Sequence, residues 1–195
     1  MPRLKLSELK SAEKGKLSLF VGRETGKNAY AALKVALLKV KEGYPLVVEF
    51  PEYNLMDVTF ADASLGRLGE EVVRGELGDR CLVLDGLWPD SLVNLEAMIA
   101  LRRPKLAFLA TDTATWYRVV GSVPDYLKQS LGLVAERGHM TAEQLAKLKK
   151  IELNAAGNHL KRLYDLRLLR REGEAKRGGT RKGAIHTYFF WQWYG

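Results

Sequence analysis

The stretch MTAEQLAKLKKIELNAAGNHLKRLYDLRLLRREGEAKRGGTRKGAIHTYFF, at residues 140–190, carries the clearest structural signals in this chain of 195 residues. Thr141, followed three residues later by Gln144, forms a capping box, which predicts that a helix begins there and spans residues 141–149. Apolar side chains recur at helical spacing over residues 154–166 and predict a second helix. We therefore expect two helices that are joined by a short turn.

The sequence on either side of these helices extends the pattern. Residues 125–137 predict an earlier helix, which makes three helices in succession. After the last helix, the charged and glycine-rich residues 170–182 separate two β-prone segments, the second at residues 185–190. Three helices followed by a hairpin with a basic tip is the element order of a winged helix-turn-helix domain.

This segment closely resembles the DNA-binding half of bacterial and archaeal winged helix-turn-helix transcriptional regulators. The similar features are the capped helix with its Leu-Ala pair, a following helix that ends in LKRLYDLRLLRR, and the charged hairpin. The resemblance implies a regulator that binds double-stranded DNA through the second of these helices and forms a homodimer to read two half-sites. Arg167 stands where the family usually has a glycine that ends this recognition helix, so we expect the helix to end less sharply.

Polar side chains on these elements fit contacts with DNA. Amides pair with the edges of bases, and cations pair with phosphates. Two simpler interpretations remain open: an ordinary amphipathic surface helix, and a loop that its charge keeps soluble. The candidates on the recognition helix are Asn154, Asn158, His159, Lys161 and Arg162, and those on the wing are Arg170, Arg171, Lys176, Arg177, Arg181 and Lys182.

The distribution of charge favours a polyanionic partner. The whole chain has 31 Lys and Arg against 23 Asp and Glu, a formal net charge of +8. Residues 122–195 hold 14 basic and 7 acidic side chains, a net of +7, whereas residues 1–121 hold 17 and 16, a net of +1. A nearly neutral domain joined to a strongly basic one is typical of proteins that bind nucleic acid.

Short apolar runs alternate with helical patterns through the first 110 residues. This alternation predicts an α/β fold with a mainly parallel sheet, and ligands of such sheets usually bind at the carboxyl ends of the strands. This alternation of strand and helix patterns ends after residue 110, so we place a boundary near Ser122 and expect two domains, residues 1–121 and 122–195. The predicted strands are residues 17–21, 46–50, 81–84 and 106–110, and the predicted helices are residues 28–40, 61–74 and 91–102.

Two N-terminal stretches, LVVEFPEYNLMDVTFADASLGRLGEEV and LDGLWPDSLVNLEAMIALRR, resemble the STAS-like domains of prokaryotic regulatory proteins. The resemblance implies a regulatory βα sandwich that serves dimerisation, a regulatory protein partner or signal sensing. In the better-known STAS family, an Asp-Ser-Ser-Gly turn carries a serine that a partner kinase phosphorylates. The corresponding turn here is DVTF at residues 57–60, where Val58 occupies the acceptor position. We expect Thr59 to cap a helix, and phosphorylation of Thr59 or Ser64 is the alternative.

Signals for catalysis or for a metal are weak. Residues 22–28 resemble a phosphate-binding loop, but they are one residue short between the glycines and lack the hydroxyl residue after the lysine. The three histidines have no cysteine or carboxylate at metal-ligand spacing, and Cys81 lies in an apolar run that predicts a buried side chain. The sequence offers no nucleophile with a base and no pair of acids, so we expect no enzyme, no cofactor and no metal.

Three further features bear on ligands, partners and location. Thr111, Asp112 and Thr113 follow the last predicted strand and form a polar cluster suited to a small ligand, although a simple turn is the plainer interpretation. Residues 188–194 contain six aromatic side chains, and we expect part of this run to contact the other domain or a second protomer. No apolar run is long enough for a membrane span or a signal peptide, so we expect a cytoplasmic protein without a membrane partner.

We therefore expect a prokaryotic DNA-binding transcriptional regulator that is not an enzyme. Two alternatives from other classes stay open. The first is a protein-interaction switch of the anti-sigma-antagonist type, which does not bind DNA. The second is a nucleotide-sensing regulator like those fused to winged helices in antiviral systems. Assays with duplex DNA, and thermal shifts with nucleotides, separate the three.

Overall fold

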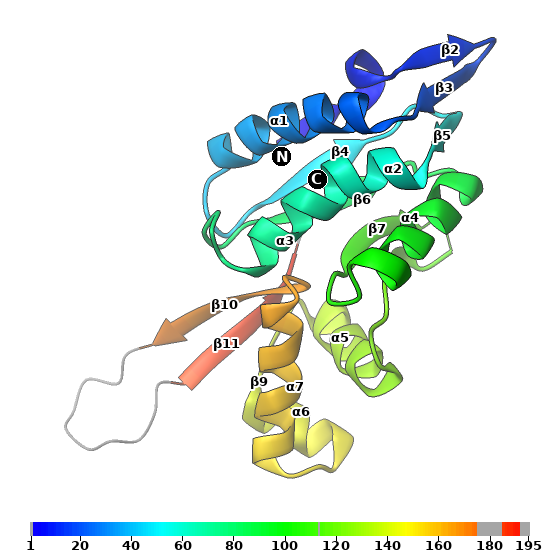
Figure 1. Ribbon diagram of the computed structural model, residues 1–195. Helices are drawn as coiled ribbons and strands as arrows, with labels where there is room; N and C mark the ends of the chain where they lie inside the picture. Colours follow the sequence, from blue (N-terminus) through cyan, green and yellow to red (C-terminus); the bar gives the residue numbers. More distant parts are fainter. Residues whose placement is uncertain (1, 113, 175–184, 192–195) are drawn as a thin grey trace. The chain divides into compact units, whose positions relative to one another are not determined.

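Figure 1 shows the computed structural model of the chain, which describes residues 2–112, 114–174 and 185–191. The chain divides in sequence between Ser122 and Val123 into two compact units. We call them the N-terminal unit and the C-terminal unit. Both units combine helices with strands, so the expected α/β class is confirmed.

A five-stranded sheet forms the centre of the N-terminal unit. The first three neighbouring pairs of strands are parallel and the last pair is antiparallel. The prediction of a mainly parallel sheet is therefore confirmed. The strand order is β1 (Arg3–Lys5), β4 (Pro45–Glu49), β6 (Cys81–Asp85), β7 (Phe108–Asp112) and β8 (Trp116–Val120).

The main helices of this unit connect the parallel strands. Because these strands follow one another in one direction across the sheet, right-handed connections place their helices on one face. Figure 1 shows α3 and α4 in front of β6 and β7. Leu33 of α1 and Leu65 of the π turn pack with Leu84 of the sheet in one core. After the 3-10 turn η1 (Leu6–Leu9), these elements are α1 (Arg23–Lys39), α2 (Val58–Ala61), the π turn η2 (Asp62–Gly66), α3 (Arg67–Val73) and α4 (Pro89–Arg102).

Several short strands differ from the prediction. The predicted strand at residues 17–21 forms β3 (Leu17–Phe20), but it pairs with β2 (Ala12–Lys14) and β5 (Asn54–Met56) in a second small sheet. Strands β1, β2 and β5 are three residues long, so no apolar run marks them. Strand β8 lies in the stretch after residue 110, where the pattern predicts no element, because most of its side chains are exposed or half-buried.

Helix α1 begins at Arg23, five residues before the predicted start at residue 28. The first turns of this helix therefore contain Gly26 and Lys27, which belong to the stretch 22–28 that resembles a phosphate-binding loop. Gly26 allows α1 to approach the next helices closely, because a Cβ there would lie 2.8 Å from the Cβ of Ala63. The pattern at residues 61–74 predicts one helix, and α2, η2 and α3 follow one another there without a break.

Three helices and an antiparallel sheet build the C-terminal unit. Helix α5 (Asp125–Arg137) has the predicted bounds. Helices α6 (Ala142–Lys149) and α7 (Leu153–Asp165) lie within one residue of theirs. The sheet has the order β10 (Leu169–Glu174), β11 (Ile185–Phe190) and β9 (His139–Thr141). The pattern predicts no strand at β9, which is only three residues long.

The predicted capping box at the start of α6 is confirmed. The Thr141 hydroxyl accepts the N–H of Gln144 at 3.3 Å, and the Gln144 side-chain oxygen accepts the N–H of Thr141 at 2.8 Å. This helix and its two neighbours contribute buried leucines to the core of the unit. They are Leu127 and Leu131 of α5, Leu145 of α6, and Leu160 and Leu163 of α7.

Helix α7 ends sharply, and the expectation drawn from Arg167 is wrong. Arg167 adopts the left-handed conformation, with φ of +60°. Its N–H donates to the carbonyl of Tyr164 at 2.8 Å, and the N–H of Leu168 donates to the carbonyl of Leu163 at 3.0 Å. These two bonds form a Schellman motif, in which arginine takes the place that glycine usually fills. The Arg167 guanidinium lies 5.1 Å from the centroid of the Tyr164 ring. The backbone carbonyl of Arg167 accepts the indole N–H of Trp191 at 3.0 Å.

Part of the aromatic run at residues 188–194 belongs to the fold of the C-terminal unit. Tyr188 and Phe190 are buried at alternate positions of β11, and Trp191 is buried beside its hydrogen bond to Arg167. Residues 192–194 lie outside the described residues. A contact of this run with a second protomer therefore stays a prediction for the remaining side chains.

Candidate nucleic-acid interface

Helix α7 has one buried side and one exposed side. Ala156, Leu160 and Leu163 recur at helical spacing and are fully buried. This amphipathic pattern fixes which side of the helix solvent can reach. The exposed side carries Asn154, Asn158, Lys161, Arg162 and Asp165.

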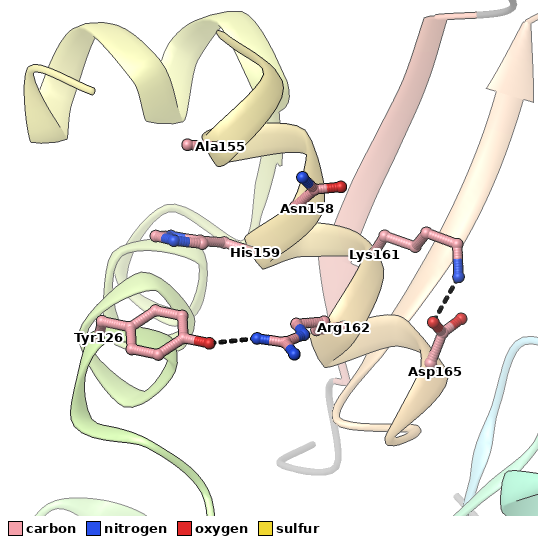
Figure 2. Close-up of a pocket in the computed structure, with 7 residues that line it drawn as sticks. All are labelled: Tyr126, Ala155, Asn158, His159, Lys161, Arg162 and Asp165. Atoms are coloured by element: carbon pink, nitrogen blue, oxygen red, sulfur yellow. Dashed lines mark hydrogen bonds and ion pairs between the residues drawn. The ribbon is translucent and has the colours of Figure 1, made fainter. Parts of the chain in front are cut away.

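A hollow of about 690 Å³ lies beside this exposed side (Figure 2). Tyr126, in the first turn of α5, lines one part, and residues of α7 line the rest. Asn154 is exposed on the same helix but does not line the hollow. Of the predicted DNA-binding residues, the hollow brings together Asn158, His159, Lys161 and Arg162, and Ala155 and Asp165 complete its lining.

Ser130 on α5 holds His159 in place. The Ser130 hydroxyl donates to the carbonyl of Tyr126 at 2.9 Å and accepts from the ammonium of Lys149 at 3.1 Å. Nδ1 of His159 lies 3.1 Å from the same oxygen. Because the single hydroxyl proton is directed at the Tyr126 carbonyl, the arrangement favours a proton on Nδ1 and leaves Nε2 as an acceptor.

The same surroundings favour the neutral form of His159. Burial, and then the charges of Lys149 and Arg162, lower the pKa of His159 below its ordinary value. Protonation would add a third positive charge beside the two that are already present. A neutral imidazole can accept a hydrogen bond from an amino group at the edge of a base, such as that of cytosine or adenine.

Arg162 is held by a residue of another helix. Its guanidinium donates a hydrogen bond to the hydroxyl of Tyr126, as Figure 2 shows. The Tyr126 ring also lies 4.8 Å, between centroids, from the ring of His159. A guanidinium that is fixed through one N–H group keeps its other donors for the oxygens of a phosphate.

Lys161 and Asp165 form an ion pair across one turn of α7, with a distance of 2.5 Å between nitrogen and oxygen. The two side chains are 60% and 50% exposed, and exposed pairs of this kind contribute little to stability. Lys161 can therefore exchange Asp165 for a phosphate at small cost in free energy. Figure 2 shows this pair at the end of the hollow away from His159.

Of the basic candidates on the predicted wing, Arg170 and Arg171 lie within the described residues. Arg170 pairs with Glu172 and lies over the ring of Phe189, and Arg171 lies 4.3 Å from the centroid of Tyr164. Both arginines are half-buried, so their stems pack on the fold while their charges stay near the surface. The remaining wing candidates, Lys176, Arg177, Arg181 and Lys182, lie outside the described residues.

Sequence reasoning missed the side chains that position the α7 candidates. Tyr126, Ser130 and Lys149 come from α5 and α6, and each contacts Arg162, His159 or another member of this set. A signal was present, because Tyr126 and Ser130 are four residues apart and so share one face of the helix predicted at residues 125–137. Helical spacing does not tell which neighbouring helix that face meets.

The turn at residues 57–60 is capped by Asp57, so the prediction that Thr59 caps the helix is wrong. The Asp57 carboxylate accepts the N–H of Phe60 at 2.6 Å and the hydroxyl of Thr59 at 2.9 Å. Thr59 already lies inside the helix, where its side chain cannot reach the unpaired N–H groups ahead of it. Ser64 is fully buried and donates to the carbonyl of Phe60 at 2.7 Å, so a kinase has no access to it in this fold.

The polar cluster after the last predicted strand lies at the end of β7. The Thr111 hydroxyl donates to Asp85 at 2.7 Å, and Asp112 pairs with Arg118 at 3.0 Å. Thr111 and Asp112 belong to β7, so the turn interpretation is wrong for these two residues. Asp112 also accepts two backbone N–H groups of the turn that follows the strand. Thr111 and Asp112 also line a pocket of the N-terminal unit. Thr113 lies outside the described residues.

Within residues 2–112, 114–174 and 185–191, no three His, Cys, Asp or Glu side chains are grouped so that they could hold a metal ion. None of the described helices has the length and apolar character needed to span a membrane. The sequence matches no protein-family model, and no curated protein is similar enough to count as a relative.

Proposed function

We propose that this chain is a DNA-binding transcriptional regulator whose C-terminal unit binds duplex DNA through α7. The observation that carries the proposal is the exposed row of Asn154, Asn158, Lys161 and Arg162 on a helix whose opposite side is buried. A helix of this kind can enter the major groove with its polar side toward the bases. The proposal makes α6 and α7 a helix-turn-helix pair and makes β10 and β11 the wing.

The exposed side of α7 carries two kinds of residue, amides that suit base edges and cations that suit the phosphates of the DNA backbone. Asn154 and Asn158 lie one turn apart, and an asparagine amide can pair with both N6 and N7 of adenine. Lys161 and Arg162 follow in the next turn and suit phosphates, which supply most of the affinity of such complexes. The net charge of +7 on residues 122–195 supports this assignment, because it attracts the duplex from a distance.

We further propose that the N-terminal unit is the regulatory half, a STAS-like domain for dimerisation, a regulatory protein partner or signal sensing. Its nearly balanced charge and its own core support a role apart from contact with DNA. A homodimer would place two copies of α7 on successive half-sites. Sedimentation velocity on the full chain should then give twice the monomer mass of 21.9 kDa, and a single monomeric species contradicts the dimer.

Fluorescence anisotropy with labelled duplex DNA tests the proposed interface. Lys161→Ala combined with Arg162→Ala should weaken binding by about tenfold or more, because two phosphate contacts are lost. The matched control is Lys128→Ala with Arg137→Ala, which removes the same charge from α5. If both double variants lose the same affinity for DNA, the effect comes from net charge and not from contacts of α7. If the α7 variant keeps the affinity of the wild type, the proposed interface is contradicted.

A further inference from the structure

A second hollow, of about 550 Å³, lies at the carboxyl edge of the main sheet of the N-terminal unit. Asp85 ends β6, and Thr111 and Asp112 end β7, so these polar side chains meet where ligands of parallel sheets usually bind. The volume lies in the range of small-molecule sites. The other polar and aromatic lining residues are Arg3, Trp116 and Arg118.

The charges that line this hollow are already balanced in pairs. Arg3 lies 3.1 Å from Asp85, and Arg118 lies 3.0 Å from Asp112. Arg3 also pairs with Glu49, which is not a lining residue. A phosphate or carboxylate would have to displace a carboxylate from one of these guanidinium groups. The arrangement therefore disfavours an anionic ligand and suits a neutral one.

One wall of the hollow is aromatic. Trp116 is 41% exposed, which leaves a large part of its indole open to solvent, and its backbone has φ of +55°. A bulky residue seldom adopts this left-handed conformation, so the backbone at the start of β8 positions the indole at a cost in free energy. Leu87, Leu92 and Ala110 add apolar lining beside the charged pairs.

We propose that this hollow binds a neutral ring that carries adjacent hydroxyl groups, as in a free sugar or the ribose of a nucleoside. A hydroxyl can donate to a carboxylate and accept from a guanidinium at the same time. Such a ligand bridges the Arg3–Asp85 and Arg118–Asp112 pairs without breaking either of them. The apolar face of the ring, or a base attached to it, packs against Trp116.

Ligand-observed saturation-transfer NMR on the full chain tests this site. The probes are glucose and ribose as sugars, adenosine and guanosine as nucleosides, and glucose 6-phosphate and adenosine 5′-monophosphate as their charged counterparts. We expect binding of at least one neutral probe, and about tenfold weaker binding of its phosphorylated counterpart. The sugar and nucleoside arms distinguish the two sources of the ring.

Trp116→Asn removes the indole and retains a residue that tolerates the left-handed backbone, so the variant should fold. It should weaken binding of the neutral probe by about tenfold. The control is Tyr44→Asn, which removes another half-exposed aromatic side chain of the same unit outside the hollow and should leave binding unchanged. Tighter binding of the phosphorylated probes, no binding of any neutral probe, or equal effects of the two variants would overturn the proposal.

Discussion

The two units use charged side chains in different ways. In the N-terminal unit, the side chain of Asp62 is only 9% exposed and lies within 3.6 Å of three arginines, Arg23, Arg102 and Arg103. In the C-terminal unit, each of the described ion pairs has at least one side chain that is more than half exposed, and basic residues outnumber acidic ones by 14 to 7 over residues 122–195. The comparison indicates that the first unit buries a charged cluster in its fold, whereas the paired charges of the second unit stay near the surface, as the proposed contact with DNA requires.

The largest expected effect is on Asp62. Asp62→Ala leaves three arginines without their shared carboxylate and should lower the free energy of unfolding of the N-terminal unit by about 3 kcal/mol at neutral pH. Hydrogen exchange, read separately for the amides of each unit, measures the loss. Asp165→Ala in the C-terminal unit is the comparison, because its partner Lys161 is exposed and the loss should be under about 1 kcal/mol. Similar losses in both variants would contradict the comparison.

A smaller effect, on affinity for DNA, is expected from the hydrogen bond between Arg162 and Tyr126 in the C-terminal unit. Tyr126→Phe removes the hydroxyl that accepts from Arg162 but keeps the ring beside His159. Affinity for duplex DNA should fall about threefold to tenfold, because Arg162 must then be ordered on binding, while stability changes by less than about 1 kcal/mol. Anisotropy titrations and thermal unfolding measure the two quantities. An affinity equal to that of the wild type would show that Tyr126 does not position Arg162.

The left-handed residue after α7 offers a paired test of stability. Arg167→Gly removes the backbone cost and should raise the free energy of unfolding of the C-terminal unit by about 0.5–1 kcal/mol. Arg167→Ala keeps that cost and loses the contact of the guanidinium with the Tyr164 ring, so it should lower stability. Urea unfolding of both variants gives the comparison. A glycine variant less stable than the wild type would mean that the lost side-chain contact outweighs the relief of the backbone strain.

The smallest effect separates the units by pH. His159 has a lowered pKa, so below the ordinary value of 6.5 the unfolded state binds more protons than the folded state. The free energy of unfolding of the C-terminal unit should therefore decrease as the pH falls below that value. Burial raises the pKa of Asp62, but the hydrogen bonds and charges of Arg103 and Arg102 outweigh burial and lower it. The contribution of Asp62 is therefore present at neutral pH and is lost as the pH falls below the ordinary value of 3.8.

Urea midpoints of the wild type and of His159→Gln, at about pH 7.5 and about pH 5, measure this contribution. The wild type should lose more stability than the variant between the two values, because only the wild type must keep a neutral imidazole beside Lys149 and Arg162. Equal losses would show that His159 titrates in the folded state as it does in the unfolded chain.

The elements that could be predicted are those whose signals are local. The bounds of α5 follow from apolar side chains at helical spacing, and those of β11 follow from a run of β-prone residues. The start of α6 follows from Thr141 and Gln144, whose reciprocal hydrogen bonds lie within four residues. Three-residue strands such as β1 and β5 depend on partners far away in the sequence, so no local pattern reveals them.

The candidate interface was predictable only in part, for the same reason. Helical spacing separates the exposed side of α7 from the buried Leu160 and Leu163, which identifies Asn158, Lys161 and Arg162. The contacts of His159 and Arg162 with α5 arise from packing between helices, and spacing within one helix does not contain that information. The conformation of Arg167 was missed because a preference for glycine is not a requirement when hydrogen bonds hold the turn.

The salt dependence of DNA binding tests the central claim most directly. Anisotropy titrations of the full chain with duplex DNA, from low to physiological salt, should give a linear fall of log affinity with log salt, with a slope of about −0.9 per phosphate neutralised. Lys161→Ala with Arg162→Ala should make that slope shallower by about 1.8. Absence of binding at low salt, or a slope that the double substitution leaves unchanged, would contradict the claim that α7 places its cations on DNA phosphates.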